Sequence, residues 1–235
     1  MKATAGVEAR RRVLADALRE VLSERDRHWL VEAIATVGAD PAAIMRLFPA
    51  AGRFLPRRVL VAEPLTAWAW TTDEAARALL LAALPAAGRD EALRELYRYG
   101  DRHERSAVLR ALNVLPVGPV TQELVPDALR TNDPRLVAAA LSATGLAVLD
   151  ERELVQAVLK CVFMDLDLTR LPLPEERITP QLSRALAGYA LERVTAGRSV
   201  PDALWPLVQR HPPHDVLAAL RRVHQRTDPA EEPAE

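Results

Sequence analysis

The sequence predicts an all-α protein whose antiparallel helix pairs stack as a HEAT-like α-solenoid. Apolar residues recur every three or four positions along most of the chain. Residues that cap helices stand at several predicted helix starts, among them Asp101 and Asp133. Helix pairs begin near residues 73, 101 and 134, a spacing of roughly 30 residues that is typical of α-hairpin repeats. Strand patterns are nearly absent, and the segment VLVA at 59–62 is a weak candidate.

The predicted elements form one helical domain over residues 1–226. Its first part, 1–48, holds three helices, and the third of these begins at Asp40 and Pro41 and runs to Phe48. Residues 49–72 contain three prolines and no clean period, so we expect an extended connector there. The third part, 73–226, is the helical stack, with helices expected at 73–86, 89–98, 101–113, 121–131, 134–145, 152–164, 180–196, 201–209 and 214–225. The Pro, Glu and Ala-rich tail at 227–235 is expected to be disordered.

Composition excludes several classes of protein. The 235 residues are 49% hydrophobic and 27% charged, as expected of a globular protein, and the net charge of −1 argues against nucleic acid as a partner. The single cysteine, Cys161, rules out an internal disulfide framework and a cysteine-based zinc site, and we expect it in the core. His211 and His214 are separated by two prolines, a pattern more typical of a loop than of metal ligands, so no metal is expected. No glycine-rich phosphate loop occurs, so no cofactor is expected. The chain opens without a signal-peptide pattern and holds no membrane-spanning stretch, which predicts a cytoplasmic protein.

Charged residues fall on the apolar faces of several predicted helices. In the helix at 101–113, Glu104 and Arg105 point toward the core side, whereas Arg110 falls on the polar face. In the helix at 180–196, Arg193 lies within the apolar stripe and Glu192 at its edge.

Two other helices show the same anomaly. Arg77 lies among leucines, with Asp73 one turn earlier, and the helix at 152–164 is apolar except for a narrow stripe that holds Gln156 and Lys160. An unpaired buried charge costs several kcal/mol, so these groups are expected to meet each other or a ligand. One interpretation is a polar pocket, and a second is a set of salt bridges between helices. A third is that these charges lie on helix surfaces and are misplaced by the geometry of a straight helical wheel. We expect Arg105 and Arg193 to be mostly buried on facing helices, within ion-pair reach of Glu104, Glu192 or Asp101.

Four segments of the chain also resemble the signature blocks of the EboA-domain family. They are GDRHER at 100–105, RTN at 130–132, QAVLK at 156–160 and YALERVTAGR at 189–198, the last followed by PDALW. The chain departs from the family pattern in three places: Leu154-Val155 replaces Trp-Asn, Leu191 and Val194 replace a His and a Trp, and ATGLAVLD replaces an Asn-Pro-Tyr-Pro segment. The chain is therefore identified as a divergent member.

The resemblance implies a function. The family is encoded in operons with a UbiA-like membrane prenyltransferase, a metal-dependent hydrolase and a sugar-cyclase-like enzyme, and these operons make or export a secondary metabolite. We therefore expect a helical accessory or binding protein, with a small-molecule metabolite or pathway enzymes as partners, the membrane prenyltransferase among them. The candidate ligand-binding residues are Arg77, Asp101, Arg105, Arg130, Asn132, Gln156, Lys160, Tyr189 and Arg193.

Two alternatives stay open. The first is an enzyme of the same pathway, with Glu104 or Glu192 as the catalytic acid or base and Arg and Lys side chains holding the substrate. The second is a HEAT-like DNA glycosylase, which requires a basic concave face and exposed aromatic side chains. A solvent-reachable cavity at the charged cluster favours binding or catalysis, and a packed cluster favours salt bridges.

Overall fold

The structure, a computed structural model, describes residues 2–60 and 69–227 and confirms the all-α class. The described residues hold a single small sheet of two strands. The chain divides into two compact units, with the boundary in the sequence between Leu149 and Asp150. The HEAT-like stacking and the single domain over 1–226 stay predictions.

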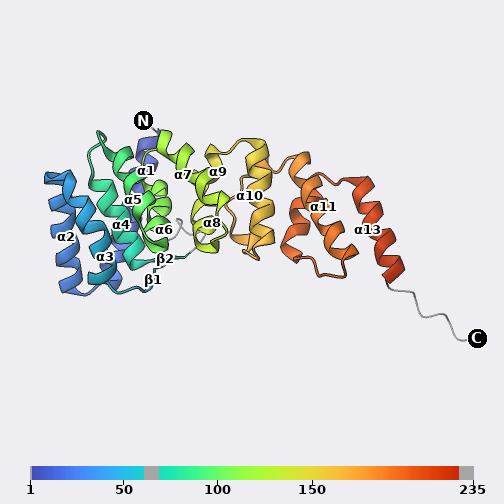
Figure 1. Cartoon of the computed structure of the whole chain (residues 1–235), viewed down its shortest axis with the longest axis horizontal. Helices are drawn as coiled ribbons and strands as arrows, with labels where there is room; N and C mark the ends of the chain where they lie inside the picture. Colours follow the sequence, from blue (N-terminus) through green and yellow to red (C-terminus); the bar gives the residue numbers. More distant parts are fainter. Residues whose placement is uncertain (1, 61–68, 228–235) are drawn as a thin grey trace, which may run out of the picture. The chain divides into compact units, whose positions relative to one another are not determined.

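The first unit consists of helices that follow one another in antiparallel turns (Figure 1). Its elements are α1 (Lys2–Val21), α2 (Glu24–Ala39), the 3₁₀ turn η1 (Pro41–Ala43), α3 (Ile44–Phe54), β1 (Val59–Leu60), β2 (Trp70–Thr71), α4 (Thr72–Ala83), α5 (Arg89–Tyr99), α6 (Arg102–Ala111), η2 (Leu112–Val114), α7 (Pro119–Arg130), α8 (Pro134–Ala140) and α9 (Ala143–Val148).

The predicted connector at 49–72 is partly wrong. Helix α3 continues through Pro49 to Phe54, because its apolar face, which includes Ile44 and Phe48, packs against α4. Tertiary burial thus outweighs the helix-breaking tendency of a proline. The weak strand candidate does form in part: Leu60 of β1 pairs with Trp70 of β2 in an antiparallel register, while residues 61 and 62 lie outside the described segments.

The helix expected at 134–145 is interrupted. It is split into α8 and α9 at Ser142, whose hydroxyl accepts a hydrogen bond from the Gly145 amide and begins a new helix. Position 145 requires glycine, because a Cβ there would lie 1.9 Å from the Ala140 carbonyl oxygen. The caps predicted at Asp101 and Asp133 are both confirmed.

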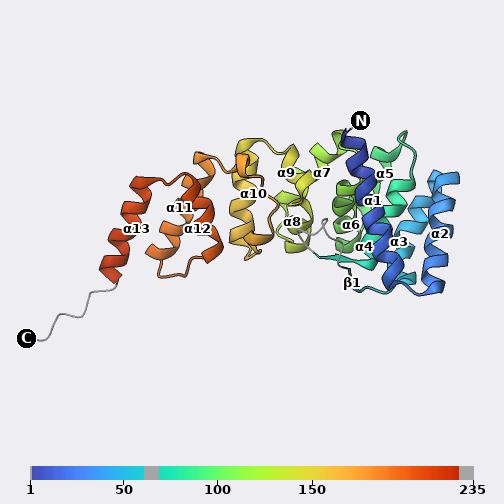
Figure 2. The same cartoon turned by 180° about the vertical axis from the view of Figure 1, so that it is seen from behind.

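Helix α6 is the centre of the first unit. It packs against α4, α5 and α8, so its side chains are buried on more than one face. Figure 2 shows α1 on the other side of this unit, next to α4. Helix α1 is fastened there by two arginines, since Arg10 Nε donates to the Asn113 carbonyl and Arg11 Nε donates to the Val114 carbonyl at 2.8 Å.

The second unit is arranged around one long helix, α11 (Pro180–Thr195). This helix packs against α10 (Glu151–Phe163), α12 (Trp205–Arg210) and α13 (His214–Thr227), and three 3₁₀ turns complete the unit: η3 (Leu168–Arg170), η4 (Glu175–Arg177) and η5 (Asp202–Leu204). Cys161 of α10 is buried in the core, as predicted.

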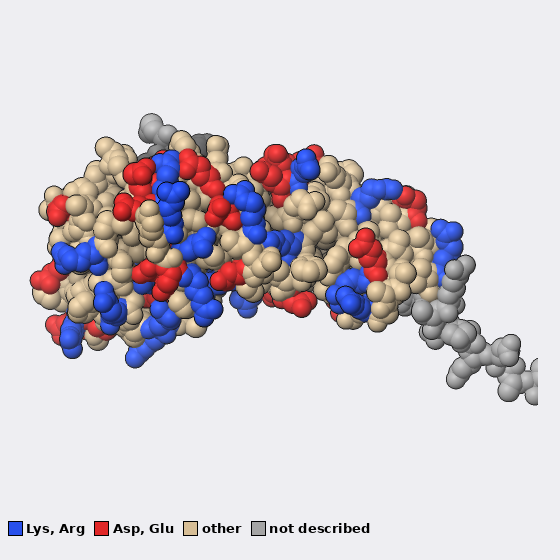
Figure 3. Space-filling model, viewed as in Figure 1, with Lys and Arg blue, Asp and Glu red and all other residues tan. Residues whose placement is uncertain are grey.

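No helix in the described ranges is both long and apolar enough to cross a bilayer. The predicted disordered tail lies outside the described residues except for Thr227, the last residue of α13. Figure 3 shows side chains of both charge signs interspersed over the visible face of the first unit. The charges are therefore mixed on this face.

Candidate functional site

The first turns of α4 carry a buried ion pair. Asp73 and Arg77 are 1% and 3% exposed, and Arg77 Nη1 lies 2.7 Å from Asp73 Oδ2. Arg77 Nε also donates to the Phe48 carbonyl at 2.9 Å, which fastens α4 to α3. The predicted burial of Arg77, with Asp73 one turn earlier, is confirmed. These contacts satisfy the guanidinium internally and identify the pair as structural.

Glu74, the next residue of α4, is the acceptor for three elements. Ser106 Oγ of α6 donates to Glu74 Oε1 at 2.9 Å, Arg110 Nε lies 3.2 Å from Oε2, and Arg135 of α8 lies 3.6 Å from Oε1. The prediction that Arg110 occupies a polar outer face is wrong, because the residue is only 9% exposed. Helix α6 is covered by α4 and α8, so the face that looks polar in the sequence is internal. Burial lowers the pKa of Arg110, and Glu74 opposes that shift.

Asp101 and Glu104 form a capping box at the start of α6. The Asp101 carboxylate accepts from the His103 and Glu104 amides, and Glu104 Oε2 accepts from the Asp101 amide at 3.0 Å. Burial raises the pKa of Asp101, but the two amide hydrogen bonds outweigh it, so the net shift is downward. Glu104 Oε1 lies 4.0 Å from Arg77 Nη2. The structure thus brings Arg77 and Glu104 together, with Glu104 engaged in the cap of its own helix.

Arg105 faces the seam between α5 and α7. Its guanidinium lies over the Tyr97 ring, 4.5 Å from the ring centroid, and Nη2 is 3.7 Å from Asp127 Oδ2. The side chain is 29% exposed, so it is mostly buried as predicted, but its ion-pair partner is Asp127 and not Glu104, Glu192 or Asp101. The Arg105 side chain points toward α5 and α7, and it lines a solvent-open pocket between these helices.

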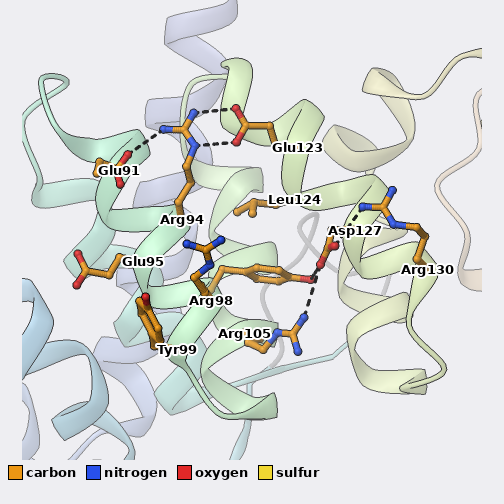
Figure 4. A pocket seen from close by; sticks show the side chains of 11 residues that line it. Glu91, Arg94, Glu95, Arg98, Tyr99, Arg105, Glu123, Leu124, Asp127 and Arg130 are labelled. Atoms are coloured by element: carbon orange, nitrogen blue, oxygen red, sulfur yellow. Dashed lines mark hydrogen bonds and ion pairs between the residues drawn. The ribbon is translucent and has the colours of Figure 1, made fainter.

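A pocket with a volume of about 630 Å³ lies at this seam (Figure 4). It brings together two of the signature segments, because Arg105 comes from the first and Arg130 from the second. The lining residues are Glu91, Arg94, Glu95, Tyr97, Arg98, Tyr99, Arg105, Glu123, Leu124, Asp127 and Arg130. Most of them were missed by the sequence analysis, because charged residues on the outer face of an amphipathic helix look like ordinary surface.

One wall of the pocket is an ion pair between α5 and α7. Arg94 Nε and Nη2 donate to the two carboxylate oxygens of Glu123 at 2.7 and 2.8 Å, and Nη1 lies 3.3 Å from Glu91. The hydrogen bonds that Arg94 donates to Glu123 raise the pKa of Arg94 and lower the pKa of Glu123. This bidentate pair holds the two helices at one end of the seam.

Asp127 is the acceptor at the other end of the seam. The Tyr97 hydroxyl donates to Asp127 Oδ2 at 3.0 Å, and Arg130 donates to Oδ1 at 3.1 Å. Burial raises the pKa of Tyr97, so the phenol keeps its proton and stays a donor at neutral pH. With the Arg105 guanidinium 3.7 Å away, two hydrogen-bond donors and a further positive charge surround one carboxylate.

Two guanidinium groups in the pocket keep unused donors. Arg105 Nε is buried without a hydrogen-bond partner. Arg98 makes no ion pair with any residue that the structure describes. In Figure 4 the Arg98 guanidinium lies between those of Arg94 and Arg105. The two guanidinium groups near the middle of the pocket therefore have N–H donors without an acceptor among the described residues.

The remaining predicted site residues are not part of this pocket. Asn132 is exposed in the turn after α7. In the second unit, Gln156 is exposed and Lys160 half-buried on α10, and on α11 Glu192 is exposed while Tyr189 is half-buried. A smaller pocket of this unit, about 220 Å³, is lined by other residues: Val162, Asp165, Leu166, Asp167, Leu168, Pro201, Asp202 and Ala203.

Arg193 also differs from its prediction. It is half-buried, its Nε donates to the Ser199 carbonyl at 2.7 Å, and its guanidinium lies 5.9 Å from the centre of the Tyr189 ring. The chain reverses after α11 at Gly197, whose φ of 67° suits glycine, and this turn brings the Ser199 carbonyl to the arginine. A local carbonyl, and not a carboxylate on another helix, therefore satisfies Arg193.

The described residues contain no set of three His, Cys, Asp or Glu side chains placed to hold a metal ion. The lining of the α5–α7 pocket consists instead of hydrogen-bond donors and acceptors, together with the faces of two tyrosines. Such a lining can bind and orient a small polar molecule.

Comparisons with known proteins agree with the signature segments. The family model described as "Metabolite traffic protein EboA" matches residues 12–209, a range that contains all four segments. Searches of curated proteins and of solved structures gave no match. With most of its length matched by that family model, the chain belongs to the EboA family.

Proposed function

We propose that the protein is a non-catalytic accessory protein that binds a small polar metabolite in the pocket between α5, α6 and α7. The pathway in which it acts makes or exports a secondary metabolite. The observation that carries this proposal is that two arginines with unused donors, Arg98 and Arg105, line a pocket of about 630 Å³. The family's description as a metabolite traffic protein supports the same class of function.

The size and the lining of the pocket fit a metabolite. Pockets that bind small molecules commonly have volumes of roughly 300–1,000 Å³. The walls here hold four arginines and four carboxylates, which favours a ligand rich in hydrogen-bonding groups. The pocket opens to solvent, since the side chains of Arg94 and Asp127 are 36% and 43% exposed. A ligand can therefore enter and leave without unfolding the unit.

Binding fits the pocket better than acid–base catalysis does. A general base needs a carboxylate that is free to accept a proton near neutral pH. The pKa of Glu123 is lowered by its hydrogen bonds with Arg94, and Asp127 already accepts from Tyr97 and Arg130. Glu104, a candidate acid–base residue, accepts from the Asp101 amide. These carboxylates are held as acceptors, so we assign them to positioning.

The other family positions extend the proposal to partners. Arg77 and Asp101 support the pocket by fixing α4 and the start of α6. We propose that the signature residues elsewhere contact a partner enzyme of the pathway, the membrane prenyltransferase among the candidates. These residues are Asn132, Gln156, Lys160, Tyr189, Glu192 and Arg193.

The test is retention of metabolites by the purified protein. The protein is incubated with a small-molecule extract of the cells that produce it, separated from unbound molecules, and the retained molecules are measured by mass spectrometry. We expect a retained metabolite that is lost in the Arg98→Gln and Arg105→Gln variants. Arg53→Gln is the matched control, because Arg53 is exposed on α3 and does not line the pocket. Equal retention by all four proteins would exclude this pocket as the binding site.

A further inference from the structure

The donors of the α5–α7 pocket also indicate what kind of ligand it takes, an inference that rests on the proposed function. We infer that the ligand carries an oxyanion group, a carboxylate or a phosphate, which binds Arg98 and Arg105 in competition with the Asp127 carboxylate. Asp127 would thus act as an internal counter-ion that sets the affinity of the pocket for anions.

Arg105 is held in place but is not fully used. Its guanidinium lies on the Tyr97 ring, and this contact restricts its position. Nε is buried without a partner, and the 3.7 Å between Nη2 and Asp127 is too long for a hydrogen bond. A guanidinium presents a planar fork of N–H groups that matches the two oxygens of a carboxylate or phosphate. Arg105 is therefore a pre-positioned donor for such a group.

Arg98 supplies the second positive charge. Two carboxylates of the pocket, Glu91 and Glu123, already pair with Arg94, which lies one turn before Arg98 on α5. Arg98 is exposed and makes no ion pair within the described residues, so its guanidinium is available to a ligand. An anion that enters between Arg98 and Arg105 replaces water on both side chains and displaces no strong internal contact.

Asp127 opposes this binding. It lies 3.7 Å from Arg105 and 3.1 Å from Arg130, so an incoming anion approaches a like charge. Like charges a few ångströms apart repel, and even with the screening of bulk water this repulsion weakens binding roughly fivefold. The Asp127 carboxylate therefore lowers the affinity of the pocket for anions. A lowered affinity suits a protein that must release the molecule it carries.

The test follows the arginine Nε–H signals by nuclear magnetic resonance at pH 6, in a buffer without phosphate or sulfate. Inorganic phosphate and succinate are titrated separately, which distinguishes phosphate from carboxylate recognition. Arg105→Lys and Arg98→Lys variants assign the two signals. We expect both signals to shift and saturate with at least one probe, while the Arg53 signal stays in place.

Two substitutions distinguish competition between Asp127 and the bound anion from a purely structural role of these side chains. Asp127→Asn keeps the shape of the side chain and an oxygen for the Tyr97 hydroxyl, but removes the charge, so affinity for the anion should rise roughly three- to tenfold. Arg98→Gln, on an exposed side chain, should lower it by a similar factor without affecting the fold. Circular dichroism checks the helix content of each variant.

Three outcomes would overturn the inference. An Asp127→Asn protein that is folded and binds the anion no better than the unsubstituted protein would contradict the competition. An anion that shifts the Arg53 signal as much as those of Arg98 and Arg105 would show non-specific binding. If neither probe shifts the pocket arginines while the extract experiment still yields a metabolite whose retention requires Arg98 and Arg105, the ligand is not an oxyanion, and the proposed function stands alone.

Discussion

The Arg110 guanidinium of α6 lies 3.2 Å from the Glu74 carboxylate of α4, and both side chains are buried. The same carboxylate accepts from Ser106 and faces Arg135. Three elements, α4, α6 and α8, are therefore joined at one glutamate. Because the pair is shielded from water, each partner depends on the other for the stability of its charge.

Arg110→Ala should destabilise the protein by about 3–5 kcal/mol, because it leaves a buried carboxylate without its nearest cation. Arg102→Ala is the control on the same helix, where the side chain is exposed and the expected cost is under about 1 kcal/mol. Urea unfolding followed by circular dichroism measures both. Similar midpoints for the two variants would mean that the Glu74 contact contributes little.

Arg193→Ala should cost about 1 kcal/mol, the usual contribution of one hydrogen bond. Its Nε donates to the Ser199 carbonyl, and its removal leaves no buried carboxylate unpaired. The comparison is Arg77→Ala, which breaks a buried ion pair and should cost several times more. Equal losses of unfolding free energy in the two variants would contradict the local role of Arg193.

Cys161 should be inert in the folded protein. Burial raises the pKa of the Cys161 thiol to about 12, so almost no thiolate exists at pH 8. A thiol reagent such as Ellman's reagent should label the protein only after unfolding in urea. A Ser199→Cys, Cys161→Ala variant provides the control, because position 199 is exposed and should react at once. Rapid labelling of the folded original protein would show that α10 opens readily.

His103 should make the protein less stable in mild acid. Burial lowers the pKa of His103 below its ordinary value of about 6.5, and the nearby cations Arg57 and Arg135 add to the shift. As the pH drops below 6.5, His103 binds a proton in the unfolded chain more readily than in the folded protein. The free energy of unfolding therefore falls as the pH drops through this range. His103→Gln should show a shallower decline between pH 7.5 and pH 5 in urea titrations. Parallel profiles would disprove the contribution of His103.

The elements that could be predicted are those whose signals are local. The caps at Asp101 and Asp133 act on amides two or three residues away, and the apolar period of a helix is visible within a few turns. Arg77 and Asp73 could be paired in advance because they are one turn apart on the same helix. The connector predicted from Pro49 onward was partly wrong, because burial of α3 against α4 outweighs the tendency of proline to end a helix.

The site could be predicted only in part. Arg105 and Arg130 were identified through the family segments, but Arg94, Arg98 and Asp127 look like surface residues in the sequence. Nothing in the sequence pairs Arg94 with Glu123, which is 29 residues away on another helix. Arg105 was assigned to the core because a helical wheel assumes one buried face and one solvent face, whereas α6 packs against three neighbours.

By itself the sequence determined the all-α class, several of the helix starts, the family and two arginines of the pocket. Helix caps, apolar periods and family motifs each depend on residues that are close together in the sequence. Only the tertiary structure decided that Arg110 is buried on Glu74 and that Arg105 opens onto the α5–α7 pocket. The physical reason is that burial of a side chain depends on which helices cover it. That covering is set by the packing of helices far apart in the sequence.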